Sequence, residues 1–306
     1  MSLVAFRRIQ IGKESTRGTL VAADRKLLGA LTMTPDVTYH RPIEERNSLA
    51  EFRRAIATSQ ITRLRFDGGA SYDQIINFLA MAAKGSVSGV QQGGTSAYLW
   101  TYTPSLTAKA VQDSFTFEYG DDTQEFECGF VLVENLELSI ALGEVVNLRT
   151  DMFATLAAKS SFTGGLSDPT NFEEIVSDNL KVYIDGTYAN LGTTQKTALV
   201  AGGRVRFATG LVPVKYADGG LDFSGVSENK RHLEIELDLI VGSDGITEYD
   251  AYIAATDRAI RLEWEGSQID AAPHLYTLTI DAIGKYTSPP ELFGDRDGEN
   301  MMRLSF

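Results

Sequence analysis

The stretch "RHLEIELDLIVG", residues 231–242, places an apolar side chain at every second position of its strand-like core. The alternate positions are polar and include Glu234, Glu236 and Asp238. Successive side chains of a strand point to opposite faces, so this pattern predicts a β-strand with one apolar face and one acidic face. The three carboxylates then follow one another at about 7 Å, because each residue of a strand rises by about 3.3 Å. What these acids face is the main question that the sequence raises.

The same period of two recurs along most of the chain. The alternating segments are 31–40, 61–69, 97–104, 113–122, 128–143, 179–188, 203–220, 232–240, 259–266 and 274–286. Turns containing Gly, Asp-Gly or Pro separate them, which is typical of a sheet-rich protein. Two further segments carry apolar residues at helical spacing, one opening with a capping box at Ser71 and the other at Thr247. The expected fold class is therefore β-rich α+β, a β-sandwich or barrel.

The order of these elements occurs twice. A strand, a long polar loop, a strand, a helix and two more strands follow one another in each half, with the loops at 41–58 and 218–230. Such self-similarity predicts an internal duplication in which each copy has one flanking helix. The expected division is an N-terminal arm over 1–25, a first repeat over 26–165, a second repeat over 166–288 and a C-terminal arm over 289–306.

The composition restricts the class of protein. The chain has 306 residues, of which 43% are hydrophobic and 23% charged, as is ordinary for a globular protein. A formal charge of −13 argues against gripping nucleic acid by its phosphates, which requires a basic surface. The single cysteine excludes an internal disulfide framework and fits synthesis in a reducing cytoplasm. Neither a signal peptide nor a membrane segment is expected, because the longest apolar run is about half of a bilayer span.

The sequence predicts no catalytic residue, no cofactor and no metal site. Cys128 alternates with apolar neighbours, which indicates a buried structural thiol. His40, His232 and His274 show none of the spacings that build zinc sites. Neither a nucleotide-binding glycine motif nor the nucleophile motif of a hydrolase is present.

Carbohydrate binding or hydrolysis by a β-sandwich is the alternative that stays open. Glu263 and Glu265 share one face of a strand, and two carboxyls about 5–9 Å apart are what a glycosidase needs. A solvated acidic face explains them more simply, because nothing in the sequence raises the pKa of one acid selectively. Tyr98, Trp100 and Tyr102 line one face of another predicted strand, where a glycan-binding module would expose them and a sheet core would bury them. We expect core packing.

Short motifs in a fixed order resemble the tail tube, or major tail, proteins of long-tailed bacteriophages. The matching positions near the start are Gly12, Glu14, Gly18, Thr19, Lys26, Leu27, Gly29, Tyr39, Arg41 and Pro42. Later ones are Tyr98, Trp100, Pro104, Tyr183, Asp185, Gly186 and Gly192, followed by "SPPELFGDRDG" at 288–298. The resemblance covers most of the chain and depends on the order of these motifs.

The resemblance implies a structural protein without enzymatic activity or cofactor. Tail tube proteins form rings whose inner sheets make a continuous barrel, and the rings stack into a hollow tube through a long loop and terminal arms. The partners implied are further copies of the chain, the tape-measure protein and other tail proteins. DNA passes through a typically acidic lumen without specific binding. The location implied is the tail of the virion, after synthesis in the host cytoplasm.

The predicted duplication bears on how such a ring would be built. If each chain contains two copies of the fold, three chains make a ring with pseudo-six-fold symmetry, whereas a single-copy chain requires six. The two copies differ in charge, because Arg63 and Arg65 stand where the second copy has Glu234 and Glu236. These four residues and Asp238 are the candidate functional charges, and they face either the lumen or a seam between subunits.

Overall fold

A computed structural model describes residues 4–170, 172–197, 199–270, 274–296 and 298–306. Strands hold 48% of the chain and helices 10%, which confirms the β-rich α+β class. The helices are α1 (Tyr72–Ala82) and α2 (Ser243–Ile253), with 3-10 turns at Val4–Phe6, Ser177–Asn179 and Tyr188–Asn190. The strands of the first half are β1 (Arg8–Lys13), β2 (Arg25–Leu27), β3 (Ala30–His40), β4 (Ile56–Gly69), β5 (Val90–Gln91), β6 (Tyr98–Leu99), β7 (Phe115–Gly120), β8 (Glu125–Ala141), β9 (Asn147–Ala154) and β10 (Ala158–Ser160). Those of the second half are β11 (Leu180–Asp185), β12 (Gln195–Lys196), β13 (Val200–Ala208), β14 (Leu211–Val214), β15 (Gly225–Glu228), β16 (His232–Ile240), β17 (Arg258–Gln268), β18 (Leu275–Gly284), β19 (Glu291–Arg296) and β20 (Glu299–Ser305).

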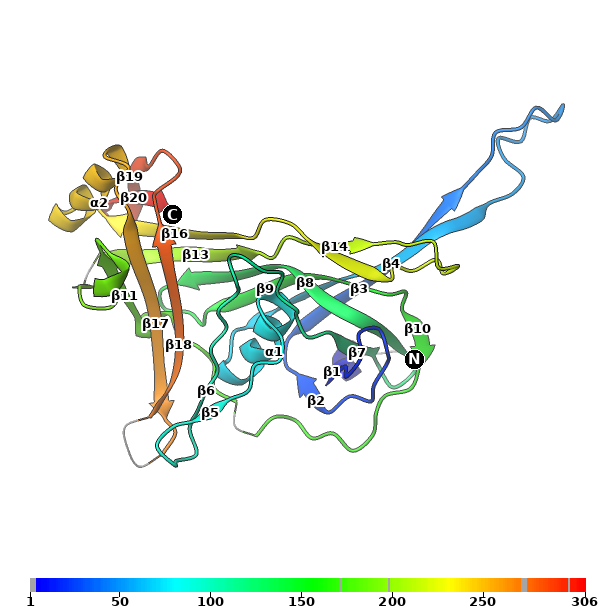
Figure 1. The fold of residues 1–306 in the computed structure, drawn as a ribbon, viewed down its shortest axis with the longest axis horizontal. Coiled ribbons are helices and arrows are strands. Elements are labelled where there is room, and N and C mark those ends of the chain that lie inside the picture. Colours follow the sequence, from blue (N-terminus) through cyan, green and yellow to red (C-terminus); the bar gives the residue numbers. More distant parts are fainter. Residues whose placement is uncertain (1–3, 171, 198, 271–273, 297) are drawn as a thin grey trace.

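A long antiparallel sheet runs through the molecule in the order β19-β20-β16-β13-β8-β9-β4-β3 (Figure 1). We call it the long sheet. Its central strand β8 has 17 residues, and only the second half of this strand lies between β13 and β9. The first half pairs instead with β7, which continues into β1 and β2. One strand thus joins two sheet segments because it is long enough to pair twice on the same edge.

The apolar face of the long sheet forms the main core. The alternating positions Ile235, Leu237 and Leu239 of β16 are at most 1% exposed, as the sequence pattern predicts. Helix α1 packs against β8, and the ring of its Phe78 lies 4.8 Å from that of Phe66 on β4. A smaller sheet, β12-β11-β17-β18, contributes Trp264 to the same core, and β17 and β18 cross the direction of β13 and β16 (Figure 1). The result is a two-layer arrangement in which the four-stranded sheet, which we call the small sheet, and helix α1 lie beside each other on the long sheet.

The two helices begin differently with respect to the sequence prediction. The hydroxyl of Ser71 accepts a hydrogen bond from the backbone N–H of Gln74 at 3.2 Å, so the predicted cap of α1 is confirmed. Helix α2 starts at Ser243, four residues before the predicted cap at Thr247. Its N-cap is Gly242, two residues after β16 ends, and no side chain caps it. The chain therefore turns directly from strand into helix.

The aromatic segment 97–104 is mostly irregular, with only the short strand β6 inside it. Tyr98 is 48% and Trp100 38% exposed, so the expectation that they pack in the core is wrong for these two side chains. Their ring centroids lie 6.1 Å apart. Tyr102 is half-buried, and its hydroxyl donates to the carbonyl of Ile76 on α1 at 3.0 Å. The segment thus covers α1 instead of completing a sheet.

Both ends of the chain, expected as arms over 1–25 and 289–306, contribute strands to the sheets. Strand β1 pairs with β7, and β20 pairs with β16. Met302 and Leu304 on β20 are each 1% exposed, because they extend the apolar face of the long sheet. The C-terminal segment therefore belongs to the fold.

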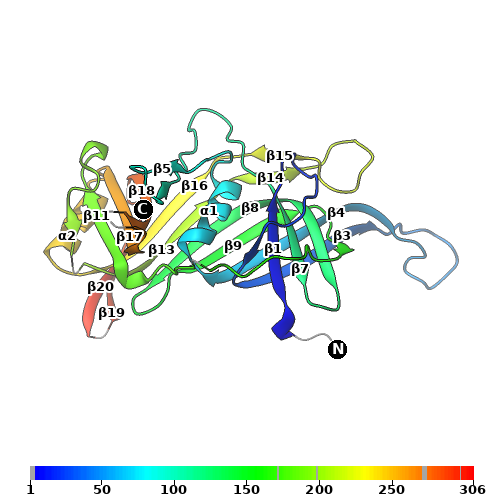
Figure 2. The same cartoon turned by 90° about the horizontal axis from the view of Figure 1, so that it is seen from below.

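The hairpin of β3 and β4 extends far beyond the body of the molecule (Figures 1 and 2). We call residues 41–55, which connect the two strands, the hairpin tip. The polar loop predicted at 41–58 is slightly shorter, since β4 already begins at Ile56. The second loop, predicted at 218–230, contains β15, which pairs with β14 in a second and shorter projection (Figure 1). Helix α2 lies at the end of the molecule opposite the hairpin tip (Figures 1 and 2).

Candidate functional surface

All five candidate charges lie on the side of the long sheet that faces away from the core. Arg63 and Arg65 are on β4, while Glu234, Glu236 and Asp238 are on β16. Strands β9, β8 and β13 lie between them. At about 4.8 Å per strand, the two sets are at least about 19 Å apart across the sheet. The structure therefore places them on one surface without bringing them into contact within one chain.

Each set instead pairs with residues of the neighbouring strands. Arg63 Nη1 lies 2.9 Å from Glu134 Oε2, and Arg65 Nε lies 2.7 Å from Asp151 Oδ1. These pairs connect β4 to β8 and to β9. All four groups are exposed or half-buried, so the pairs are surface contacts.

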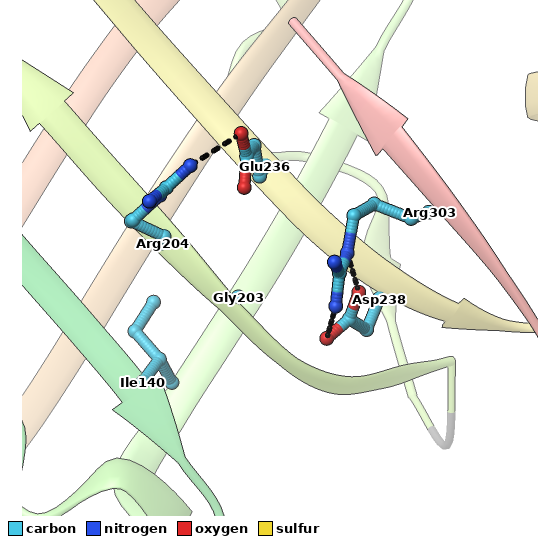
Figure 3. A pocket seen from close by; sticks show the side chains of 6 residues that line it. All are labelled: Ile140, Gly203, Arg204, Glu236, Asp238 and Arg303. Carbon is cyan, nitrogen blue, oxygen red and sulfur yellow. Dashed lines mark hydrogen bonds and ion pairs between the residues drawn. The ribbon is translucent and has the colours of Figure 1, made fainter. Parts of the chain in front are cut away.

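The acids of β16 pair in the same way on both of their sides (Figure 3). Arg204 Nη2 on β13 donates to Glu236 Oε1 at 2.7 Å. Arg303 on β20 donates twice to Asp238, with Nε to Oδ1 at 2.6 Å and Nη2 to Oδ2 at 3.2 Å. Glu234 stands across from Arg206 in the β13–β16 register. The acidic face predicted from the sequence is thus flanked by arginines on both neighbouring strands.

We call this side of the long sheet the charged face. Its arginines and acids, taken from the described residues, are Arg63, Arg65, Arg149, Arg204, Arg206 and Arg303 together with Asp36, Asp67, Glu134, Glu137, Asp151, Glu234, Glu236, Asp238, Glu291 and Glu299. Six positive and ten negative groups give the face a net charge of −4, against −13 for the whole chain. Most of the negative charge of the protein therefore lies elsewhere, and on this surface arginines stand across from acids of neighbouring strands.

The electrostatics of the charged face hold the arginines in place. Donating to Glu236 raises the pKa of the Arg204 guanidinium, and donating to Asp238 raises the pKa of Arg303. Both groups stay charged at any physiological pH, because even an unperturbed arginine loses its proton only above about pH 12. Exposed pairs of this kind contribute about 0–1 kcal/mol each, since water and salt screen them. They determine the local charge pattern more than the stability of the fold.

Two open depressions lie on the charged face. The first has a volume of about 270 Å³ and is lined by the two ion pairs of β16 together with Ile140 and Gly203 (Figure 3). The second has a volume of about 450 Å³, and its lining includes Arg63, Arg65 and Asp151. Charged groups that already pair with one another dominate both linings.

Other chemistry expected or considered from the sequence can be located in the fold. Cys128 is 1% exposed, and burial raises the pKa of its thiol above the ordinary range. The thiol is therefore protonated at neutral pH. Within the described ranges, no group of three or more His, Cys, Asp or Glu side chains could hold a metal ion. In the same ranges, every helix is too short or too polar to cross a bilayer.

The partners of the acids are the candidate residues that the sequence did not reveal. Arg204 and Arg206 sit at alternate positions of a predicted strand, just as Glu234 and Glu236 do. Matching the spacing of these two strands would have suggested that they pair. No comparable signal exists for Arg303. Helix α2 and strands β17, β18 and β19 separate its strand from β16 in the sequence.

Comparison with known proteins adds no relative. No model of a known protein family matches the sequence, and a search of curated proteins finds no match either.

Reversing one charge of this face tests whether its ion pairs contribute to the free energy of unfolding. Arg204→Glu would place a third acid between Glu137 and Glu236, whose carboxylates it now faces. We expect a loss of about 1 kcal/mol in the free energy of unfolding, the scale of an exposed pair. The double variant Arg204→Glu/Glu236→Arg should recover most of this loss in a denaturation experiment at low salt. Equal stability of the single and double variants would show that the two groups do not interact.

Proposed function

We propose that this chain is the structural subunit of a viral tail tube, which assembles into stacked rings that conduct DNA into the host. The observation that carries the proposal is the long sheet, whose strand order repeats once and whose two outermost strands have free edges among the described residues. The proposed partners are further copies of the chain, the tape-measure protein and other tail proteins. The proposed location is the virion, after synthesis in the host cytoplasm, and no enzymatic activity or cofactor is proposed.

The pairing pattern supports an internal duplication. In the first half, β3-β4-β9-β8 are neighbours in the long sheet, and in the second half β13-β16-β20-β19 are neighbours in the same relative order. Beside them, β2-β1-β7-β8 corresponds to β12-β11-β17-β18. A helix follows β4 in one half and β16 in the other. Each of these pairings thus has a counterpart in the other half, while the short pairings β5–β6 and β8–β10 occur in the first half alone among the described residues.

Individual residues follow the same correspondence. Across three strands of the first half, Glu137 pairs in register with Arg149 and Arg149 with Asp67. Across the equivalent strands of the second half, Glu291 pairs in register with Arg303 and Arg303 with Asp238. The order Glu, Arg, Asp is the same in both, so the equivalence extends from strand order to single positions.

The charge pattern supports assigning the charged face to the lumen. A protein holds DNA when its Lys and Arg side chains replace the counterions of the phosphates. Here each arginine of the face stands across from a carboxylate, so few free positive charges are offered to a phosphate. The intrachain partners also favour this assignment over a seam in which Arg63 and Arg65 meet acids of another subunit. A wall of paired charges with a small negative excess would let a polyanion slide.

Counting the chains in a ring tests the proposal. Purified protein at high concentration should form rings or tubes in negative-stain electron microscopy, because the free sheet edges favour pairing with further copies. Native mass spectrometry of an isolated ring should give three chains, since each chain supplies two copies of the fold. Six chains per ring would contradict the internal duplication, but the proposal that the chain forms a tube would still stand. A stable monomer under all assembly conditions would overturn the tube itself.

One observation favours a function of another class. The exposed Tyr98 and Trp100 form an aromatic pair of the kind that carbohydrate-binding modules or glycoside hydrolases present to sugars. A monomer that binds a glycan array through this pair would support that alternative. The repeated strand order and the free sheet edges have no part in such a function, so we place it second.

A further inference from the structure

The two ends of the long sheet are open. Among the described residues, β3 pairs along one edge only, with β4, and β19 pairs along one edge only, with β20. Free edges present unpaired N–H and C=O groups and invite another strand. The question is which strand fits them, and the interior of the chain contains a template for the answer.

That template is the joint between β8 and β13, where the two halves of the chain meet. These strands are antiparallel, with Glu137 opposite Arg206 and Leu138 opposite Val205. The N–H of Thr209 donates to the carbonyl of Glu134 at 3.0 Å, which marks a hydrogen-bonded pair of the ladder. Since such pairs alternate with non-hydrogen-bonded ones, Glu137 and Arg206 form a non-hydrogen-bonded pair, with their side chains close together.

The correspondence between the halves transfers this joint to the free edges. Glu291 occupies the position of Glu137, because each lies opposite the equivalent arginine of the next strand. Thr34 occupies the position of Arg206, because Thr34 faces Arg63 as Arg206 faces Glu234. By the same register, Leu292 corresponds to Leu138, and Met33 corresponds to Val205.

The residues at the free edges are more exposed than their equivalents at the joint, as expected when the neighbouring strand is absent. Leu138 is 1% exposed beneath the joint with β13, whereas Leu292 on the free edge is 45% exposed. Val205 is 2% exposed, whereas Met33 is only partly buried. The exposed apolar side chains at both ends of the sheet would be covered if the β19 edge of one chain packed against the β3 edge of another chain.

We propose that β19 of one copy pairs antiparallel with β3 of the next copy, with Glu291 opposite Thr34 and Leu292 opposite Met33. The inference rests on the ring-forming function proposed above and names the strands and the register through which the ring closes. Because the two edges differ, the contact is head-to-tail, and such a contact generates a ring when its rotation closes. The β8–β13 joint inside each chain and the seam between chains would then alternate around the ring.

Two prolines set the end of this seam. The residue after Thr34 is Pro35, and the residue before Glu291 is Pro290. In the transferred register they face each other at a position that is hydrogen-bonded in the template, and proline has no N–H to donate. The ladder therefore stops there. In the unassembled chain, Pro35 also protects an otherwise long free edge from unspecific pairing.

Disulfide cross-linking tests both the strands and the register. In the variant Thr34→Cys/Glu291→Cys, oxidation of the assembled protein should link most chains to one another, because non-hydrogen-bonded pairs bring side chains close enough for a disulfide. The reference Glu137→Cys/Arg206→Cys should form the same bond within one chain. The control Asp36→Cys/Glu291→Cys moves one thiol by two residues, about 7 Å along the strand, and should link poorly. Wild-type protein should not link, since its only thiol, Cys128, is buried.

The outcomes separate this inference from the proposed function. Rings in electron microscopy, with linked chains for Thr34→Cys/Glu291→Cys and few for the Asp36→Cys control, support the seam. Rings without such links, while the intrachain reference oxidises fully, overturn the seam and leave the tube proposal standing. Preferential linking in the Asp36→Cys control overturns the register. Failure of wild-type protein to form any ring overturns the tube and the seam with it.

Discussion

Replacing the hairpin tip, residues 41–55, by an Asn-Gly turn between His40 and Ile56 is expected to abolish tube formation and to leave the protein folded. The tip extends far from the body, and it exposes Ile43 and Leu49 almost completely to solvent. Exposed apolar side chains on a projection are suited to contacting another ring. Electron microscopy should show isolated rings, and size-exclusion chromatography should show no long tubes.

The fold should tolerate this deletion because the tip interacts mainly with itself. Its ion pairs join Arg46 and Arg54 to Glu44, and the guanidinium of Arg41 lies 4.8 Å from the ring of Phe52. An Asn-Gly pair is the preferred connection for a two-residue hairpin turn. The melting temperature should therefore stay close to that of the wild type.

A matched control distinguishes the apolar contacts of the tip from its length. The variant Ile43→Ser/Leu49→Ser keeps the full tip and removes two exposed apolar side chains, and it should weaken stacking in proportion. Tubes of normal length from the deletion variant would contradict the role proposed for the hairpin tip. A deletion variant that no longer folds would contradict the structural independence described above.

Substitution of Trp264 by alanine is expected to destabilise the protein by about 3–5 kcal/mol, as is usual for a large aromatic side chain removed from a core. Trp264 is fully buried on β17, within the core that the small sheet shares with the long sheet. The cavity would lie between two layers that other strands hold in place, so the site can collapse only partly. Chemical denaturation followed by circular dichroism measures the loss.

Phenylalanine at the same position is the matched control. The indole N–H of Trp264 is buried and has no hydrogen-bond acceptor, so Trp264→Phe removes an unsatisfied donor and leaves most of the aromatic volume. Its cost should stay below about 1.5 kcal/mol, the range of swaps that nearly conserve volume. An alanine variant as stable as the phenylalanine variant would show that this part of the core is loosely packed.

Local features of the fold could be predicted from the sequence where the signal is itself local. The period of two in 232–240 gave the strand and the side that it buries, and the capping box at Ser71 gave the start of α1. The prediction for the segment around Trp100 was wrong, because its alternating aromatic residues resemble a strand, whereas the segment is mostly irregular and covers a helix. The helix start predicted at Thr247 was also wrong, because the helix begins earlier, directly after a glycine that follows the end of the preceding strand.

The candidate surface shows the same limit. The acids Glu234, Glu236 and Asp238 were found from the sequence, and so was the face of the strand that carries them. Their partners were not found, because Arg204 and Arg303 come from strands whose proximity depends on the whole sheet. A strand's own residues determine which side chains share a face, but not which strand lies beside it.

The sequence by itself thus determined the class of the fold, the two faces of its strands, the two helices and an overall negative charge. Only the tertiary structure decided that the acidic strand lies between two strands that carry arginines, and that most acids of the resulting surface stand across from a positive group. The physical reason is the range of the interactions. Side-chain alternation follows from the geometry of a single strand, whereas strand order depends on closing long loops and burying a shared apolar face.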